Sequence, residues 1–252
     1  MASQLAVLSR EVALYKGASY AKSTQAAYKT HLKTYLRFCC YNGCVPVPAS
    51  QETLSCYVAF LARSLSPSSI ASYLNIIRIL HLDAGLANPL ENNWELQMVR
   101  RGVARLRGVP VKQKLPITLA LLRDFFPYLD HYSSSFDKSF WAAALIASFG
   151  FFRKSTILPI SAGAPGGICR RDVQGLTRVS FDLVVRHTKT IQFGQRVLTL
   201  PFVHCLDHRL CPVRALLSHL TSSPAPMDAH IFTFPSSGKL CLLTHSTFVA
   251  KS

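Results

Sequence analysis

The feature that most constrains the fold is a nearly apolar run in the second half of this 252-residue chain. The run covers residues 139–152 and is bounded by Lys138 and Arg153. Crossing a bilayer takes about 20 apolar residues, so the run is too short for a membrane segment. It predicts instead a buried core helix from about Phe136 to Phe152. Gly150 would let the chain turn or pack closely just before Arg153.

The first half of the chain carries four helical patterns, each with a start signal. These helices are expected to begin at Thr24, at Ser50, at Ser66-Pro67 and near Asn93, because these residues are favoured at helix N-termini. Four helices with short connections predict a small bundle. Their inward-facing residues are expected to be Tyr28, Leu32, Tyr35, Leu36 and Cys39, then Leu54, Val58 and Leu61, then Ile70, Leu74, Ile77 and Leu80, and finally Leu96, Val99, Val103 and Leu106.

The second half mixes helical and strand patterns. Besides the core helix, which should bury Trp141 and Phe149–Phe152, the expected elements are helices from Thr118 to about Leu129, from Pro212 through Leu220 and from Thr244 onward, and strands over Arg171–Val173, Ser180–Arg186 and Arg196–Leu200. The last two strands would form a hairpin with a longer loop that contains Lys189. The fold class predicted for the whole chain is mainly α with a small β-sheet.

The charge is strongly biased: only 16% of residues are charged, yet the net charge is +16. A surface of one sign favours a polyanionic partner. The most basic stretch is expected to contact phosphates without reading bases, and it comprises Arg100, Arg101, Arg105, Arg107, Lys112 and Lys114. A membrane surface, or a solvated linker that touches nothing, is the alternative interpretation.

Eight cysteines raise the question of disulfides or a zinc site. The N-terminus lacks the layout of a secretory signal, so the thiols are expected to be reduced. His204, Cys205, His208 and Cys211 lie within eight positions, but no Cys-x-x-Cys pair accompanies them. Core or surface thiols are therefore favoured over a metal site.

Several motifs occur in an order that resembles the tyrosine recombinase (phage integrase) family. These are the Gly-Phe-Phe-Arg-Lys-Ser segment around Arg153, Arg170–Val173, Thr188-Lys189-Thr190 and Leu210–Leu216. The closer likeness is to recombinases of DIRS and Crypton mobile elements, and it covers roughly residues 24–252. The resemblance implies an N-terminal arm over residues 1–22, a four-helix SAM-like core-binding domain that clamps DNA over 23–108, a basic linker over 109–116 and a partial α+β catalytic domain over 117–252.

The resemblance also implies a chemistry: transesterification of a phosphodiester by a tyrosine hydroxyl, without metal or cofactor. Arg153 matches the first arginine of the family and Lys189 matches its hairpin lysine; these are the two catalytic positions carried over. The implied partner is double-stranded DNA, with a homo-oligomer forming on it, no membrane and no small-molecule substrate. Nuclear localisation is expected.

The sequence departs from the family pattern at the nucleophile and the second box. No tyrosine follows Tyr132, and no arginine stands three positions after His245. The position where an acidic residue often follows the first arginine holds Thr156. We therefore expect a C-terminally truncated, catalytically incomplete DNA-binding protein. The alternatives are a recombinase that is active only if the gene model is incomplete or a partner donates the missing groups, and a non-enzymatic helical interaction module. Arg153 could also simply cap a helix, and Lys189 could be solvated.

Overall fold

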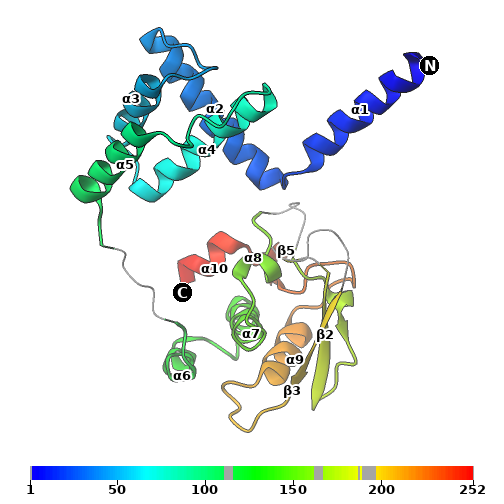
Figure 1. Cartoon of the computed structure of the whole chain (residues 1–252). Coiled ribbons are helices and arrows are strands. Elements are labelled where there is room, and N and C mark those ends of the chain that lie inside the picture. Colours follow the sequence, from blue (N-terminus) through cyan, green and yellow to red (C-terminus); the bar gives the residue numbers. More distant parts are fainter. Residues whose placement is uncertain (1, 111–115, 162–166, 187, 189–196, 252) are drawn as a thin grey trace. The chain divides into compact units, whose positions relative to one another are not determined.

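The computed structural model describes residues 2–110, 116–161, 167–186, 188 and 197–251. It contains two compact units, residues 1–113 (unit 1) and 114–252 (unit 2), drawn in Figure 1. The described part of unit 1 contains helices and loops but no strand, and unit 2 combines helices with two small antiparallel sheets. The predicted class, mainly α with a small β-sheet, is confirmed.

Unit 1 consists of helices α1 (Ala2–Ala18), α2 (Lys22–Asn42), α3 (Gln51–Leu61), α4 (Pro67–Asp83) and α5 (Trp94–Arg107). Three of the four predicted N-cap residues cap their helices as expected. The side chains of Ser50, Ser66 and Asn93 accept hydrogen bonds from backbone amides three positions on, at 3.1, 3.4 and 2.9 Å. These bonds satisfy amides that lack a partner inside the helix, and so fix where α3, α4 and α5 begin.

The predicted start of α2 at Thr24 is wrong. The helix begins at Lys22, and Ala21 at the N-cap offers no side-chain hydrogen bond. The end of α2 follows the expected chemistry, because Gly43 adopts the left-handed conformation (φ 65°) and donates its N–H to the Cys39 carbonyl. That conformation is accessible to glycine without steric cost.

The core of unit 1 lies between α2, α3, α4 and α5. It buries most of the predicted stripe residues, including Tyr35, Leu54, Ile77 and Leu96. Two expectations fail: Leu36 is 42% exposed and Leu106 is 88% exposed. Both lie at the edge of the predicted apolar stripe of their helix, on a side that the described part of unit 1 leaves exposed.

Helix α1 differs from the other helices of unit 1, because every side chain described in it (residues 4–18) is exposed. Its exposed apolar residues include Leu5, Leu8, Val12 and Tyr15. Gln25 of α2 donates to the Gly17 carbonyl at the end of α1, 2.7 Å away. A helix of this length usually gains most of its stability from tertiary packing. The described part of unit 1 does not bury any of these side chains, so it does not stabilise α1 in this way.

The helices of unit 2 are α6 (Leu119–Phe125), α7 (Ser135–Phe149), α8 (Lys154–Ile157), α9 (Pro212–Ser222) and α10 (His245–Lys251), with 3₁₀ turns η1 (Phe126–Tyr128) and η2 (Arg170–Asp172). Thr118 caps α6 as predicted, since its hydroxyl accepts from the Leu121 amide at 3.2 Å. The helix expected to reach about Leu129 ends at Phe125 and continues as η1. Helix α9 begins at Pro212, as the sequence predicts.

The sheets of unit 2 are small. Strands β1 (Val173–Gln174), β2 (Ser180–Val185) and β3 (Leu198–Val203) form one antiparallel sheet in that order. The β2–β3 register pairs Phe181 with Phe202 and Val185 with Leu198. The expected strand over Arg171–Val173 is mostly the 3₁₀ turn η2. A second hairpin, β4 (Thr233–Ser236) with β5 (Lys239–Leu242), was not predicted.

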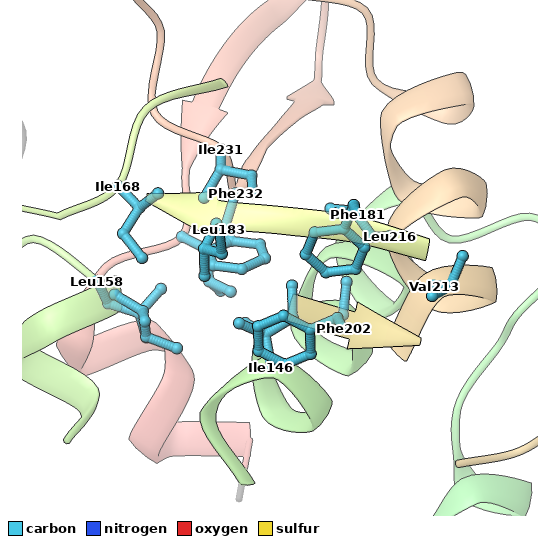
Figure 2. Close-up of a cluster of buried hydrophobic side chains, with 14 of the residues drawn as sticks. Ile146, Leu158, Ile168, Phe181, Leu183, Phe202, Val213, Leu216, Ile231 and Phe232 are labelled. Atoms are coloured by element: carbon cyan, nitrogen blue, oxygen red, sulfur yellow. The ribbon is translucent and has the colours of Figure 1, made fainter. Parts of the chain in front are cut away.

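The main core of unit 2 forms where α7 and α9 pack against β2 and β3. Figure 2 shows Ile146 of α7 together with Phe181, Leu183 and Phe202 of the sheet. The rings of Phe181 and Phe202 stack at a centroid distance of 4.8 Å. Trp141 is buried in a neighbouring cluster and donates its indole N–H to the Arg209 carbonyl at 3.0 Å. The apolar run of residues 139–152 thus begins as a buried helix, as predicted, with its buried side chains ending at Ile146.

The predicted burial of Phe149–Phe152 is only partly correct. Phe152 packs against the core, but Phe149 is 38% exposed and Phe151 is 95% exposed. The reason is that α7 ends at Phe149, three residues earlier than expected. Beyond that point the chain reverses, and only one of the remaining aromatic side chains can face the core.

Candidate functional site

The first candidate site is the junction between α7 and α8, where Arg153 lies. The Phe152 amide donates to the Ala147 carbonyl at 2.9 Å, which closes the end of α7. A Cβ at Gly150 would lie 2.4 Å from the Phe152 ring and 2.9 Å from the Ile146 carbonyl oxygen. The predicted close packing at Gly150 is therefore confirmed, and it holds Phe152 inward and the following residue outward.

Phe151 has the rare left-handed conformation (φ 51°) although it is not glycine. A bulky residue in that region is strained, and such strain is found preferentially at functional sites. The side chain is almost fully exposed, directly before Phe152 and Arg153. The sequence predicted that Phe151 would lie in the core. The left-handed turn at Phe151 has no local sequence signal, because it depends on the residue at which α7 ends.

Arg153 is exposed and precedes the first residue of α8. Its carbonyl accepts the Thr156 amide at 2.8 Å, but its guanidinium forms no ion pair with the described acidic residues. Thr156, at the position where the family often has an acidic residue, is buried. The interpretation of Arg153 as a cap for α7 is not supported, because Gly150 and Phe152 close that helix. The result is a fixed backbone that presents an unpaired guanidinium, a group suited to a phosphate.

Lys189, Lys112 and Lys114 lie outside the described residues. The strands on either side of the Lys189 segment are β2 and β3. Arg186 follows β2 directly and forms an ion pair with Asp172, with Nε 3.1 Å from Oδ1. Asp172 also accepts the Cys169 amide at 3.0 Å, so the end of β2 is tied to η2.

The second candidate site is the solvent-facing side of α5 in unit 1. Arg100, Arg101, Arg105 and Arg107 are all exposed, and none has an acidic partner within the described part of the chain. Arg101 and Arg105 are four positions apart and share one stripe of the helix, while Arg100 and Arg107 share another. Arg100 and Arg101 also line a hollow of about 300 Å³ together with residues of α3 and α4.

Helix α2 carries a second basic stripe, which the sequence analysis missed. Lys22, Lys29, Lys33 and Arg37 are all exposed, and the helix contains no acidic residue. The last three are spaced four apart, so they line one face of α2. The sequence already contained the pattern that predicts this stripe. Its cations recur every four residues, on the side of the helix opposite Tyr35 and Cys39.

The charge is shared equally between the units. Unit 1 has thirteen Lys and Arg against five Asp and Glu, and unit 2 has fifteen against seven, so each contributes half of the net charge of +16. A binding partner of negative charge is thus favoured by both units.

Not every basic residue is available to a ligand. Arg170 of η2 is buried, and it donates to the Ser223 carbonyl and to Thr233 Oγ1. Burial lowers the pKa of its guanidinium. Next to it, His219 is fully buried and bonds through Nε2 to the Ile231 carbonyl at 2.7 Å. Burial, more than the neighbouring Arg170 charge, lowers the pKa of His219 to about 4. Both residues belong to the core of unit 2.

The described part of the chain was compared with the requirements of a metal site and of a membrane-spanning helix. No three His, Cys, Asp or Glu side chains converge there closely enough to hold a metal ion, the segment around His204 and Cys211 included. All eight cysteines are free thiols. None of the described helices is both long and apolar enough to span a bilayer.

Comparison with known proteins gives one similar protein and no matching family model. No family model matches the sequence. An integrase/recombinase xerD homolog of Selenomonas ruminantium is 27% identical over 214 residues. The match covers 81% of this chain and 58% of the relative, so the chain spans little more than half the length of that protein. This similarity suggests the tyrosine recombinase family, in line with the order of the motifs around Arg153.

Proposed function

We propose that these 252 residues bind double-stranded DNA and derive from a tyrosine recombinase that acts in DNA recombination. The observation that carries the proposal is that the exposed cations of α2, α5 and the Arg153 junction have no acidic partner among the residues that the structure describes. The similarity to the integrase/recombinase homolog supports the same function. Unpaired, exposed guanidinium and ammonium groups gain most from a phosphate backbone, because binding releases the counterions condensed on DNA.

The proposed role of α2 and α5 is to hold the DNA backbone. Their arginines and lysines lie on exposed helix faces, and such contacts position a protein without reading the sequence. Each ion pair with a phosphate adds about one unit to the slope of log affinity against log salt concentration.

The proposed role of Arg153 is to bind the phosphate at which the complete family reacts. A rigid guanidinium fork stabilises the negative charge that develops on a phosphate under attack. Lys189, outside the described residues, is proposed to act on the same phosphate. Because no tyrosine follows Tyr132, we propose that these 252 residues bind DNA without cutting it.

A salt series tests DNA binding directly. The affinity of the wild-type chain for a random 30-base-pair duplex is measured by gel shift between 50 and 200 mM salt. The double variant Arg101→Ala/Arg105→Ala should lower the salt slope by about 2. The matched control Arg10→Ala/Arg78→Ala removes two exposed arginines that lie outside both basic stripes and should leave the slope within about 0.5 of wild type. Affinity that does not change with salt would exclude the proposed function.

A suicide substrate tests the chemistry. A nicked duplex that traps a covalent phosphotyrosine link is incubated with the chain, and the products are separated under denaturing conditions. We expect no protein–DNA adduct. An adduct would show that a tyrosine at or before Tyr132 acts as nucleophile, or that a second chain supplies the group.

The finer assignments are also proposals. The likeness to DIRS and Crypton recombinases favours an origin in a mobile element, a nuclear location and assembly of several chains on DNA. Fluorescence microscopy of the tagged chain in a eukaryotic cell tests the location, and sedimentation of the chain with and without duplex tests the assembly.

A further inference from the structure

Unit 2 has a second concentration of basic side chains, away from Arg153. A hollow of about 610 Å³ lies beside α9 and is lined by Lys138 of α7, Arg178 of the β1–β2 turn, His204 after β3 and Arg214 of α9. No acidic residue is among the described residues that line it. We call this hollow the α9 basic pocket.

These four side chains come from four different elements, and hydrogen bonds fix the backbone or side chain of three of them. The Thr177 hydroxyl accepts the amides of Val179 and Ser180 at 3.1 and 3.0 Å, which fixes the turn that carries Arg178. The His204 amide donates to the Val179 carbonyl at 2.7 Å, so the end of β3 is bound to the same turn. The Lys138 ammonium donates to the Tyr132 carbonyl at 2.9 Å. The segments that line the pocket are therefore held by hydrogen bonds of the folded unit.

Helix α9 supplies hydroxyl groups between the cations. Ser218, Thr221 and Ser222 line the pocket with Arg214, and spacings of four, seven and eight positions bring them onto one face of the helix. The hydroxyls of Ser218 and Thr221 make no hydrogen bond to other described residues, whereas Ser222 Oγ donates to the His219 carbonyl at 3.0 Å. The opposite face of α9 is buried through Val213, Leu216 and His219, so the polar face is fixed toward the pocket.

Two arginines of the pocket, Arg178 and Arg214, differ from other arginines of unit 2 in lacking an ion pair with a described carboxylate. Lys138 does have an acidic neighbour, because backbone hydrogen bonds and, to a smaller extent, the Lys138 charge lower the pKa of Asp130. Arg123 and Arg209 both bind Asp207, at 2.8 and 3.2 Å, and these contacts lower the pKa of Asp207 to about 2. No ion pair is formed by Arg178 or Arg214 within the described ranges. Guanidinium groups and hydroxyls without an acidic neighbour are the donor set that binds phosphate oxygens.

The pocket and the Arg153 junction lie at different ends of unit 2. Lys138 is in the first turn of α7 and Arg153 follows its last, and the helix rises roughly 16 Å between Lys138 and Phe149. Figure 2 shows Leu158, just after α8, at one side of the core and Val213 of α9 at the other.

We infer that the α9 basic pocket binds backbone phosphates of a second nucleic-acid segment while the Arg153 junction binds the first. The inference rests on the proposed DNA-binding function and extends it, since one chain would then hold two segments at once. A free polyphosphate has the same phosphate chemistry and is the other source that the test must separate.

The test uses the full-length chain with nitrogen-15 labels on serine and threonine. Nuclear magnetic resonance spectra are recorded during titration with a random 30-base-pair duplex and, separately, with sodium tripolyphosphate. With the duplex, the amide signals of Ser218, Thr221 and Ser222 should shift. The double variant Arg178→Ala/Arg214→Ala should abolish these shifts and lower the ratio of dissociation constants between 200 and 50 mM salt by about tenfold. The control Arg171→Ala/Lys239→Ala removes two exposed cations outside the pocket and should preserve both.

The outcomes separate the two proposals. If the duplex binds but the Ser218 and Thr221 signals do not move, the pocket inference is wrong and the proposed function stands. If only tripolyphosphate moves them, the pocket takes a free polyphosphate and the assignment to nucleic acid is overturned. If the two double variants weaken duplex binding equally, the pocket contributes only general charge and the inference fails. If the wild-type chain binds no duplex at all, the proposed function fails together with this assignment.

Discussion

Two arginines of unit 2, 17 positions apart in the sequence, have opposite environments. Arg153 is exposed at the end of a tightly closed helix, without a carboxylate among the described residues. Arg170 is buried in the η2 turn and is held by the Ser223 carbonyl and the Thr233 hydroxyl. Both belong to motifs that resemble the recombinase pattern. Position in a motif therefore does not decide whether a cation is available to DNA; burial does.

The difference has a physical cause. A guanidinium in water is available to a phosphate, and phosphate binding releases counterions. A guanidinium in the core has already lost its hydration and can be retained only if backbone and hydroxyl oxygens accept its protons. An exposed guanidinium such as that of Arg153 therefore contributes to DNA binding and little to the stability of the fold. A buried guanidinium such as that of Arg170 contributes to the stability of the fold and little to DNA binding. Four experiments test this difference between exposed and buried groups.

The largest effect is expected for Arg170→Ala. The substitution leaves a cavity and removes the donor to the Ser223 carbonyl, so we expect a loss of about 4 kcal/mol in the free energy of unfolding of unit 2. Urea denaturation followed by the fluorescence of buried Trp141, in a Trp94→Phe background, measures unit 2 alone. Arg170→Met retains most of the volume and should recover at least half of the loss. A change below about 1 kcal/mol for Arg170→Ala would place the residue among ordinary surface positions.

Acid should destabilise unit 2 through His219. Burial lowers the pKa of this imidazole from 6.5 to about 4, so between these values the unfolded chain binds a proton that the folded chain does not. The contribution is complete above pH 6.5 and is lost as the pH falls toward 4, a change of about 3 kcal/mol. Urea denaturation at several pH values checks this. His219→Gln keeps a donor for the Ile231 carbonyl and should remove this part of the pH dependence; an unchanged profile would contradict the assignment.

Gly150→Ala should disturb the Arg153 junction itself. The added Cβ would lie 2.4 Å from the Phe152 ring, so the ring must leave the core, at about 2 kcal/mol. We expect a lower midpoint of urea denaturation and weaker duplex binding together, because Arg153 follows Phe152 directly. The control is Gly102→Ala, where the added Cβ meets nothing within 4 Å and stability should not fall. Equal behaviour of the two variants would disprove the close packing at Gly150.

The smallest effect on stability is expected for Arg153→Ala. An exposed side chain that forms no ion pair with the described acidic residues should change the free energy of unfolding by less than about 0.5 kcal/mol. Duplex affinity, measured by gel shift at 100 mM salt, should fall about fivefold, equivalent to about 1 kcal/mol. Arg171→Ala removes another exposed arginine of unit 2 and serves as the control. A loss of stability without a loss of affinity would reverse the roles of Arg153 and Arg170.

Much of the secondary structure could be predicted because its determinants are local. Ser50, Ser66 and Asn93 accept amides only three positions away, and the period of the apolar residues in α2 to α5 indicates which faces are buried. The prediction failed where neighbours decide the outcome. Leu106 is exposed in the described part of unit 1, and η2 replaces a strand where its amides bond to Met227 and Ala229. The β4–β5 hairpin is a different kind of miss, because its Ser237-Gly238 turn, with positive φ at both residues, is a local signal that the sequence prediction did not use.

The amino-acid sequence alone was sufficient for the fold class, the buried helix before Arg153, the basic character of α5 and the likeness to recombinases. Each of these depends on residue types and spacings along one segment. The tertiary structure was required to distinguish the exposed Arg153 from the buried Arg170, to place Phe151 in solvent and to bring Lys138, Arg178, His204 and Arg214 around one pocket. These properties arise from contacts between segments that are distant in the sequence, and burial and unpaired charge become defined only when those contacts form.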